Sequence, residues 1–512
     1  VRRAGNRHAM IAPWNVYQAR DGWLLVCVGS DAQWQRLCDI MGRPDLRRAS
    51  EFERTPDRVR RAAGIDRLVQ AWTARHTIET CVAALNAAQI ACGPIVRIDG
   101  HPREANLDHR GMICRLRDPV SGRDVVLPGS PLRTSACSGR PPERIPAPDA
   151  DRDVIGELAS RQRRQEASPS APPAGPRAPL AGIRIVEIGH YTTVPLCTRI
   201  LASLGAEVIK VEPPEGEATR DWPPTQRGQG YFFTYTNSDK RSLVLDLRRD
   251  ADAADLRRLV GRADVLIENL KPGALARRGF SPAEMAALNP ALIYCSISGF
   301  GAESLYAGRP AYDSVVQAMS GIMDRVRSDG VPVKTGISSA DLLGAEMGVL
   351  AVLAALAWRD RTGAGQYIDL SMQDIAAWAT QTAWNAAHPA DRPACALACR
   401  DGYVVAVAET EDAGQALEKL TRSLERTEAV AELARRRVQV APVLTVHEML
   451  AQPHTAARGL WFPVSDDGET WPLLASPLRL TRPPPAVRKP MPALGRDSAE
   501  ILASLRRAAA SR

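Results

Sequence analysis

Residues 180–214 read LAGIRIVEIGHYTTVPLCTRILASLGAEVIKVEPP and contain the signals for a strand, a helix and a second strand. The runs Ile183–Ile188 and Glu207–Glu212 are short, apolar and rich in β-branched residues, which is typical of buried parallel strands. The segment Pro195–Leu204 between them predicts a helix that connects the two strands. This stretch therefore predicts a βαβ unit.

The same alternation continues along the chain. Further strands are predicted at Ser242–Leu247, Asp264–Asn269, Leu292–Ser298 and Gln366–Met372, with helices at Asp252–Val260 and Pro282–Leu288. Alternating strands and helices predict an α/β fold, a Rossmann-like parallel sheet with helices on both faces. Because ligands of such sheets bind beyond the carboxyl ends of the strands, we expect the chemistry in the loops that follow them.

The first of these loops is Gly189–Pro195. Thr192 or Thr193 is the expected N-cap of the following helix, with Pro195 at its first position. The free amides of such a first turn can hold a phosphate, although simple helix capping explains the same residues. The loop has neither a G-x-G-x-x-G fingerprint nor a Walker A pattern.

Composition and charge exclude several classes of protein. The 512 residues are 45% hydrophobic and 24% charged, which excludes collagen-like and wholly disordered chains and indicates two to four domains. The net charge of +8 lies in residues 1–178, where 28 Arg exceed 20 acidic residues. These Arg residues are scattered among acids without a basic stripe, so we expect no nucleic-acid partner.

The cysteine, histidine and apolar residues follow neither the pattern of a zinc site nor that of a membrane span. The ten Cys and eight His are dispersed without the paired spacing of a zinc site, so no metal is expected. The longest apolar run, Met347–Trp358, is shorter than a membrane span needs. We therefore expect a cytoplasmic protein without a membrane partner or signal peptide. Since the chain begins with Val1, we expect it to be processed or part of a longer protein.

The chain contains an internal repeat. RDGWLLV (20–26) returns as RDGYVVA (400–406), HRG (109–111) as ARG (457–459), and SPLR (130–133) as SPLR (476–479). The second copy is shorter between its Asp-Gly pair and the proline that follows. This distance is 72 residues in the first copy, from Gly22 to Pro94, and 40 residues in the second, from Gly402 to Pro442. We call residues 1–137 the first copy and residues 391–479 the second copy.

Several blocks in the central part carry a resemblance to a known family. They include LAGIRIVEIGH, LASLGAEVIKVEPP, NSDKRSLVLDL, ADVLIENLKPGALARRGF, NPALIYCSISGFG, AYDSVVQAMSG and the stretch from Ala340 to Asp374. In this order they resemble the class III (CaiB/BaiF-type) CoA-transferases. The two copies resemble the small domain that follows the α/β half in that family, whose members are interlocked dimers or fused tandem modules.

The resemblance implies a nucleophile and its chemistry. The family's nucleophilic Asp, in a short segment before a Gly-rich helix, corresponds to Asp341. A carboxylate can attack an acyl-CoA thioester and then carry CoA as an aspartyl thioester. With an ordinary pKa near 3.9, this carboxylate is expected to be ionised at pH 7. Without the family context, an Asp before a helix reads as a cap.

The resemblance also implies contacts to CoA, which would be a substrate and not a permanently bound cofactor. The positions that match are His190, Tyr191, Thr192, Thr193, Leu245, Arg248, Asn269, Leu270, Lys271, Arg277, Arg309 and Tyr312. Arg and Lys suit the phosphates of CoA. The sequence departs from the family pattern at two places that affect these contacts. Val194 stands where many relatives have Gly. The glycine-rich loop of formyl-CoA transferase has its nearest counterpart in Gly5-Asn6-Arg7-His8, which lies in the first copy.

These observations predict a four-part organisation. Residues 1–137 form a small α+β domain from the back half of a first module, and residues 138–179 a Pro/Ala/Ser-rich linker. Residues 180–390 form the catalytic Rossmann-like domain, and residues 391–512 a shortened small domain with a C-terminal helix. We expect a homodimer or an intramolecular pseudo-dimer, with the first copy packed against the α/β domain.

Two alternative functions remain open at this stage. An α-methylacyl-CoA racemase shares the expected fold, but its Gly-His-Asp segment corresponds here to Ala311-Tyr312-Asp313, and a Tyr is a poor substitute for His as a base. The other alternative is a non-catalytic partial module that completes an assembly with another chain. The leading prediction is a CoA-transferase that acts on an acyl-CoA and a carboxylic acid.

Overall fold

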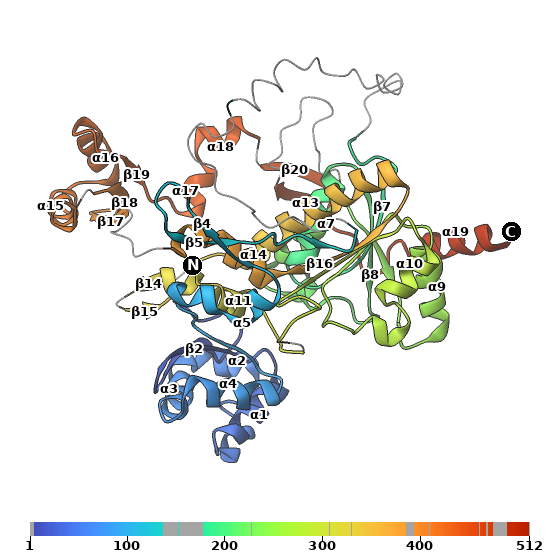
Figure 1. Cartoon of the computed structure of the whole chain (residues 1–512), viewed down its shortest axis with the longest axis horizontal. Helices are drawn as coiled ribbons and strands as arrows, with labels where there is room; N and C mark the ends of the chain where they lie inside the picture. The colour runs from blue at the N-terminus through green and yellow to red at the C-terminus, as the bar shows by residue number, and fades with distance from the viewer. Residues whose placement is uncertain are drawn as a thin grey trace. The chain divides into compact units, whose positions relative to one another are not determined.

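The computed structural model describes residues 5–136, 152, 178–226, 228–306, 308–328, 330–385, 394–408, 410–459, 461–466, 469–474 and 489–510 (Figure 1). They form two compact units: Val1–Trp384 with Val464–Trp471 and Leu478–Arg512, and Asn385–Pro463 with Pro472–Pro477. The predicted linker, 138–179, lies outside the described residues except at Arg152, Ala178 and Pro179.

A seven-stranded sheet forms the centre of the first unit, with the strand order β11-β8-β7-β12-β13-β16-β6. Its strands are β11 (Arg241–Val244), β8 (Glu207–Glu212), β7 (Arg184–Ile188), β12 (Val265–Glu268), β13 (Ile293–Ser298), β16 (Gln366–Ser371) and β6 (Arg133–Thr134). Neighbours pair in parallel except β6, which runs antiparallel to β16. Every residue of β12 and β13 is buried, as expected when helices cover both faces of a sheet.

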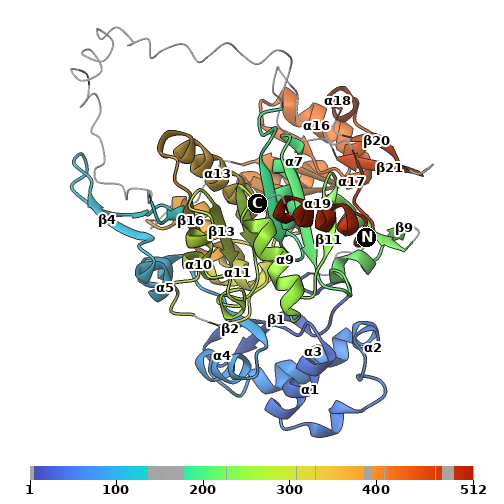
Figure 2. The ribbon, with the colours of Figure 1, turned by 90° about the vertical axis from the view of Figure 1, so that its right-hand side faces the viewer.

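Helices pack on both faces of this sheet. They are α7 (Thr193–Ser203), α8 (Tyr231–Asn237), α9 (Asp250–Val260), α10 (Pro282–Leu288), α11 (Asp313–Met319), α13 (Ser339–Thr362), α14 (Met372–Ala379) and α19 (Ser498–Ala510). One apolar core joins α7 and α13 to the sheet, and a second joins α9, α10 and α19 to its other face. Figure 2 looks onto the face covered by α9 and α19. The predicted α/β class is confirmed.

The predicted elements agree with the structure to within a few residues, and β8 and α10 have the predicted bounds. The predicted start of α7 is wrong, because the helix begins at Thr193 and Pro195 occupies its third position. Pro is tolerated there since the first amides of a helix have no intrahelical acceptor. Thr192 is the N-cap, but its side chain makes no capping hydrogen bond.

The first copy has a sheet of its own, of strands β1 (Trp14–Ala19), β2 (Gly22–Cys27) and β3 (Ala91–Pro94). The helices α1 (Asp31–Ile40), α2 (Thr55–Arg60), α3 (Ala62–Thr73) and α4 (Ile78–Ala87) lie between β2 and β3, and a core around Trp34 fills the space beneath them. The other face of this sheet packs on α11. There Gly93 permits the close approach, because a Cβ at this position would lie 2.8 Å from Cγ of Met319.

A later part of the first copy reaches deeper into the α/β domain. It contains η2 (Ile98–Arg103), α5 (Ala105–His109) and the hairpin β4 (Ile113–Arg117) and β5 (Asp124–Pro128) before β6. Arg110, fully buried, pairs with Asp374 at 2.6 Å and with Asp369 at 2.9 Å. Asn106 donates a hydrogen bond to Oε1 of Gln373 at 2.9 Å. The expected packing of the first copy against the α/β domain is therefore present.

The shorter elements of the first unit complete its loops. They are η1 (Pro44–Arg47), η3 (Ala218–Asp221), β9 (Thr225–Gln226), β10 (Gln229–Gly230), η4 (Ala276–Arg278), α12 (Ile322–Arg325), β14 (Arg327–Ser328), β15 (Val331–Pro332) and η5 (Gln381–Ala383).

The second unit repeats the plan of the first copy. Its antiparallel strands are β17 (Ala394–Cys399), β18 (Gly402–Val407) and β19 (Val440–Pro442), with helices α15 (Glu411–Thr421), α16 (Arg426–Arg435), α17 (Val446–Leu450) and α18 (Pro453–Ala457). The hairpin β20 (Trp461–Asp466) and β21 (Glu469–Leu474) follows them in sequence. Gly22 and Gly402 open the second strand of each copy with φ of 151° and 150°. The repeat seen in the sequence is thus confirmed in the backbone.

Candidate active site

The helices α7 and α13 begin at the same place. Thr193, the first residue of α7, donates a hydrogen bond from Oγ1 to Oδ1 of Asp341 at 2.7 Å. Asp341 is the third residue of α13, so the expectation that it precedes this helix is wrong. The family resemblance identified the segment that contains Asp341, but the helix already begins at Ser339.

Two glycines of α13 bring the helix against its neighbours. A Cβ on Gly344 would lie 2.9 Å from Cγ2 of Thr193, and one on Gly348 would lie 3.0 Å from Sγ of Cys197. Real Cβ atoms almost never approach so closely. The Gly-x-x-x-Gly spacing of α13 therefore allows Asp341 to reach Thr193.

Asp313, the first residue of α11, caps α13. Its Oδ1 accepts hydrogen bonds from the backbone amides of Ala340 at 2.9 Å and of Asp341 at 3.3 Å. Its Oδ2 accepts a hydrogen bond from Gln317 at 2.7 Å. The capping interpretation of Asp341 is therefore wrong, because a carboxylate from another helix satisfies these amides and leaves the Asp341 side chain for Thr193.

The surroundings of Asp341 change its ionisation. Burial, and then the neighbouring charge of Asp313, raise the pKa of Asp341 to about 7, although hydrogen bonds from Thr193 and Thr192 oppose the rise. Burial also raises the pKa of Asp313. The expectation of an ordinary pKa near 3.9 is wrong, because the side chain is only partly exposed and faces a second carboxylate.

The loop before α7 is held in place from several sides. Asn269 binds both main-chain groups of His190: Oδ1 accepts from its amide at 2.8 Å, and Nδ2 donates to its carbonyl at 2.9 Å. Glu217 accepts a hydrogen bond from the amide of Tyr191 at 2.7 Å. Tyr191 has a φ of 62°, a left-handed conformation that is unfavourable for a bulky residue. These bonds hold it there.

Four buried charges lie beneath this loop. Lys210 contacts Glu187 and Glu217, each at 2.8 Å, and donates to the carbonyl of Gly189 at 2.8 Å. Lys240 pairs with Glu187 at 2.7 Å and donates to the carbonyl of Pro195 at 2.8 Å. Burial alone would raise the pKa of Glu187, but the two lysines lower it to about 2. The cluster is neutral overall and fixes both ends of the loop.

A family model described as CoA-transferase family III matches residues 1–152, 180–413 and 397–498. The chain belongs to CoA-transferase family III. The predicted class of enzyme, a CoA-transferase, is confirmed at this level.

Curated family III relatives and a solved structure agree with this assignment. Succinate--glutarate CoA-transferase from Agrobacterium fabrum is 33% identical over 381 residues, which cover 64% of this chain and 95% of the relative. Acetyl-CoA:oxalate CoA-transferase from Acetobacter aceti is 43% identical over 196 residues, 38% of this chain and 50% of the relative. A CAIB/BAIF family protein from Brucella suis matches with a TM-score of 0.58 and 33% identity over 64% of this chain and 99% of its own.

The twelve residues that we expected to bind CoA have different surroundings. His190, Tyr191, Thr192, Thr193 and Asn269 come together beyond the carboxyl ends of β7 and β12. Leu245 and Leu270 pack in or against the apolar core beneath α9. Of the remaining five, Tyr312 packs against Trp14, and the other four are cationic.

The four cationic residues among these positions have different partners. Arg248 is exposed and pairs with Asp246, and Arg277 is exposed beside Gly273. Lys271 donates a hydrogen bond to Gln89 of the first copy at 2.6 Å. Arg309 lies over the ring of Tyr306, 4.5 Å from its centroid.

Two residues near Asp341 were missed as site residues. Asn6 binds the loop before α13 from both sides, donating to the carbonyl of Pro332 and accepting from the amide of Lys334, each at 2.8 Å. Asp313 was noted only as the neighbour of Tyr312. The signal for Asn6 was its place in the Gly5–His8 run, which we compared with a glycine-rich loop.

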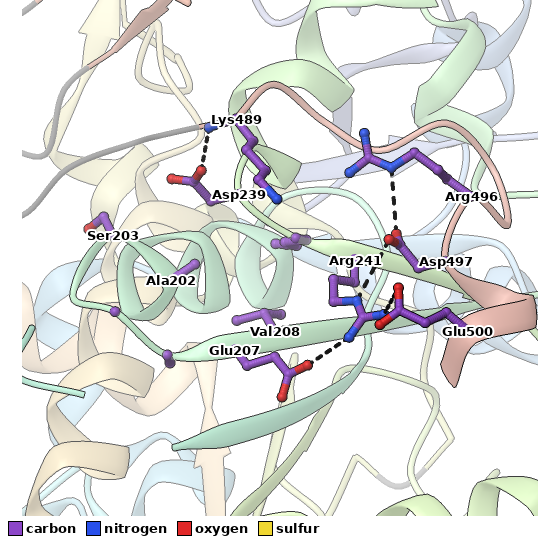
Figure 3. Close-up of a pocket in the computed structure, with 13 residues that line it drawn as sticks. Ala202, Ser203, Glu207, Val208, Asp239, Arg241, Lys489, Arg496, Asp497 and Glu500 are labelled. Atoms are coloured by element: carbon purple, nitrogen blue, oxygen red, sulfur yellow. Dashed lines mark hydrogen bonds and ion pairs between the residues drawn. The ribbon is translucent and has the colours of Figure 1, made fainter. Parts of the chain in front are cut away.

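A separate cavity of about 420 Å³ lies at the amino ends of the strands, away from the carboxyl ends where the loop before α7 begins (Figure 3). It is lined by residues at the amino ends of β8 and β11 and by the C-terminal segment, among them Glu207, Arg241 and Lys489. Arg241 pairs there with Glu207 at 2.9 Å and with Glu500 at 3.0 Å. Since Asp341 is not among its lining residues, this cavity is not the candidate site.

Within the described ranges, no group of three His, Cys, Asp or Glu side chains is placed to hold a metal ion. One described helix, α13, is long and apolar enough to cross a membrane, and half of its most apolar window is buried inside the protein. Its packing against the sheet is that of a core helix.

Proposed function

We propose that this chain transfers CoA from an acyl-CoA to a carboxylic acid through an aspartyl-CoA thioester on Asp341. The observation that carries the proposal is a partly exposed carboxylate at the start of α13, bound by Thr193 and next to the carboxylate of Asp313. Perturbed carboxylates of this kind are frequent at functional sites. The names of the relatives, which include succinate, glutarate and oxalate, support acyl-CoA and carboxylate substrates.

The proposed reaction proceeds in four steps. The Asp341 carboxylate attacks the thioester carbonyl, which forms a mixed anhydride and releases CoA thiolate. The thiolate attacks the carbonyl of Asp341, which releases the donor acid and leaves an aspartyl-CoA thioester. The acceptor carboxylate attacks this thioester, forming a second anhydride and freeing the thiolate again. The thiolate then attacks the acyl carbonyl, giving the new acyl-CoA and restoring Asp341.

Local structure favours this role in two ways. The amino end of α13, a helix of 24 residues, carries a partial positive charge that stabilises a carboxylate or a developing oxyanion. Thr193 holds one oxygen of Asp341 and so fixes the direction from which a thioester is attacked. A pKa near 7 leaves about half of the nucleophile ionised at neutral pH.

We further propose that Arg248, Lys271 and Arg277 bind the phosphates of CoA. All three side chains are exposed, and they belong to the segments that follow β11 and β12, with Arg277 in η4. CoA binds as a substrate, and the reaction steps above need no metal and no permanent cofactor.

The repeat supports a proposal for assembly. The first copy, as the back half of one module, completes the α/β domain of residues 180–390, while residues 138–179 act as a linker. The second copy, within residues 391–512, has the same hairpin and strand order as the first. The chain would then work in the cytoplasm as a tandem or dimeric assembly, with the second copy serving another α/β domain.

The test is to trap the intermediate. An acyl-CoA supplied without acceptor, in the presence of hydroxylamine, is expected to leave a hydroxamate on the peptide that contains Asp341. Asp341→Asn removes the anionic nucleophile and is expected to lower transfer by about three orders of magnitude or more.

The matched control is Asp360→Asn, an exposed residue at the other end of the same helix, which is expected to keep wild-type transfer. Because Asp313 and not Asp341 caps α13, the Asp341→Asn protein is expected to fold. A hydroxamate on another carboxylate, such as Asp313, would show that the assignment is wrong.

A further inference from the structure

Five aromatic rings form a closed circuit that includes Tyr191 and Tyr312, which belong to the two segments that bind Asp341. Neighbouring ring centroids are separated by 5.1 Å (His8–Trp14), 5.2 Å (Trp14–Tyr312), 6.3 Å (Tyr312–Tyr191), 5.7 Å (Tyr191–Trp222) and 6.5 Å (Trp222–His8). These separations are those of favourable aromatic pairs. We call these five rings the aromatic wall.

The wall is attached to both segments that hold Asp341. Tyr312 directly precedes Asp313, whose carboxylate binds the amide of Asp341. Tyr191 lies two residues before Thr193, whose hydroxyl binds the side chain of Asp341. The wall and the proposed nucleophile are therefore positioned by the same two segments.

The wall is partly open to solvent. Tyr191 is 39% exposed, Trp14 is buried, and the other three rings are partly exposed. Tyr191 keeps its place in the unfavourable left-handed conformation described above. Exposed apolar surface and backbone strain are both common at ligand sites.

The wall carries no charge at neutral pH. Burial and the nearby ammonium of Lys334 lower the pKa of His8 to about 4, and burial raises the pKa of Tyr312 to about 12. Lys334 also acts on Asp313, so part of its charge is offset by that carboxylate.

We propose that the aromatic wall binds the acyl group of the CoA thioester, and that this chain prefers acids with a planar apolar body, such as an aromatic ring, over short dicarboxylic acids. Flat rings stack on aromatic side chains, whereas a second carboxylate finds no ionic partner in the wall itself. His8 and Trp14 come from the first copy, so acyl specificity would be shared between the two modules. This inference rests on the proposed role of Asp341.

The experiment compares two donors in the first half-reaction. The rate of hydroxamate formation on Asp341 is measured in the full chain against the concentration of benzoyl-CoA or succinyl-CoA. The expected ratio of specificity constants, benzoyl over succinyl, is above one. Trp14→Leu and Tyr191→Asn are each expected to lower this ratio by about tenfold, because each removes one ring; Asn tolerates the left-handed backbone of residue 191.

The control is Trp72→Leu, which removes a ring from the separate core of the first copy and is expected to leave the ratio unchanged. Modification of Asp341 that is faster with succinyl-CoA, or a ratio that neither wall variant changes, would overturn this inference and leave the proposed function standing. No modification of Asp341 by either donor would overturn both.

Discussion

At the scale of single residues, the site depends on two carboxylates with different partners. The carboxylate of Asp313 accepts hydrogen bonds from the amides of α13 and from Gln317. The carboxylate of Asp341 accepts hydrogen bonds from threonine hydroxyls and is repelled by the charge of Asp313. Burial favours the neutral form of both. The charge of Asp313 therefore raises the pKa of the proposed nucleophile.

This arrangement predicts the pH dependence of the first half-reaction. In the proposed mechanism only ionised Asp341 attacks, so hydroxamate formation should fall about tenfold per unit below pH 7 and level off above it. Asp313→Asn removes the repelling charge but keeps an oxygen for the amides, so the midpoint should move to lower pH by about one unit. The pH profile of the modification rate measures both effects, with Asp360→Asn as the control; an unmoved midpoint in Asp313→Asn would contradict the prediction.

At the scale of elements, the contact between α7 and α13 brings Thr193 to Asp341. It depends on Gly344, since a methyl group at this position would meet Cγ2 of Thr193 at 2.9 Å. Both helices lie in one apolar core with little free space, so a shift of either one changes the geometry of the site.

Gly344→Ala should therefore destabilise the protein by about 1–3 kcal/mol through overpacking and slow the modification of Asp341. Gly64→Ala is the matched control, because it also lies within a helix but its Cβ would meet only Arg67, at 3.9 Å. There the gain in helix propensity should stabilise the protein by up to about 1 kcal/mol. Equal effects of the two substitutions in denaturant titrations would refute the overpacking argument.

At the scale of the whole molecule, the first copy is joined to the α/β domain through buried polar contacts. Arg110 is fully buried between Asp369 and Asp374, whereas Arg458, its counterpart in the repeat, is exposed. The same residue type at the same place in the repeat thus has two environments.

Arg110→Ala should lower the free energy of unfolding by about 3–5 kcal/mol, because it leaves two buried carboxylates without their cation. Arg458→Ala should change it by less than about 0.5 kcal/mol, as is usual for an exposed side chain. Chemical denaturation of the full chain compares them, and a loss below about 1 kcal/mol in Arg110→Ala would be evidence against a structural role for this ion pair.

The sequence by itself determined the α/β class, the strand order along the chain, the repeat and the family. These features depend on local periodicity and on blocks of residues that are contiguous in the chain. The parallel strands of the large sheet, which are β7, β8, β11, β12, β13 and β16, could therefore be placed to within a few residues. Asp341 was also identified from such a block, whereas the predicted starts of α7 and α13 were wrong.

Only the tertiary structure decided how the site is built. The cap of α13 comes from Asp313, 27 residues before the amide of Ala340, and Asn6 binds Lys334 across 328 residues. The pKa of Asp341 depends on burial and on a carboxylate of another helix, and the five rings of the aromatic wall come from four separate segments. No local pattern encodes such contacts, because they form only when the sheet brings the ends of its strands, and the first copy, to one place.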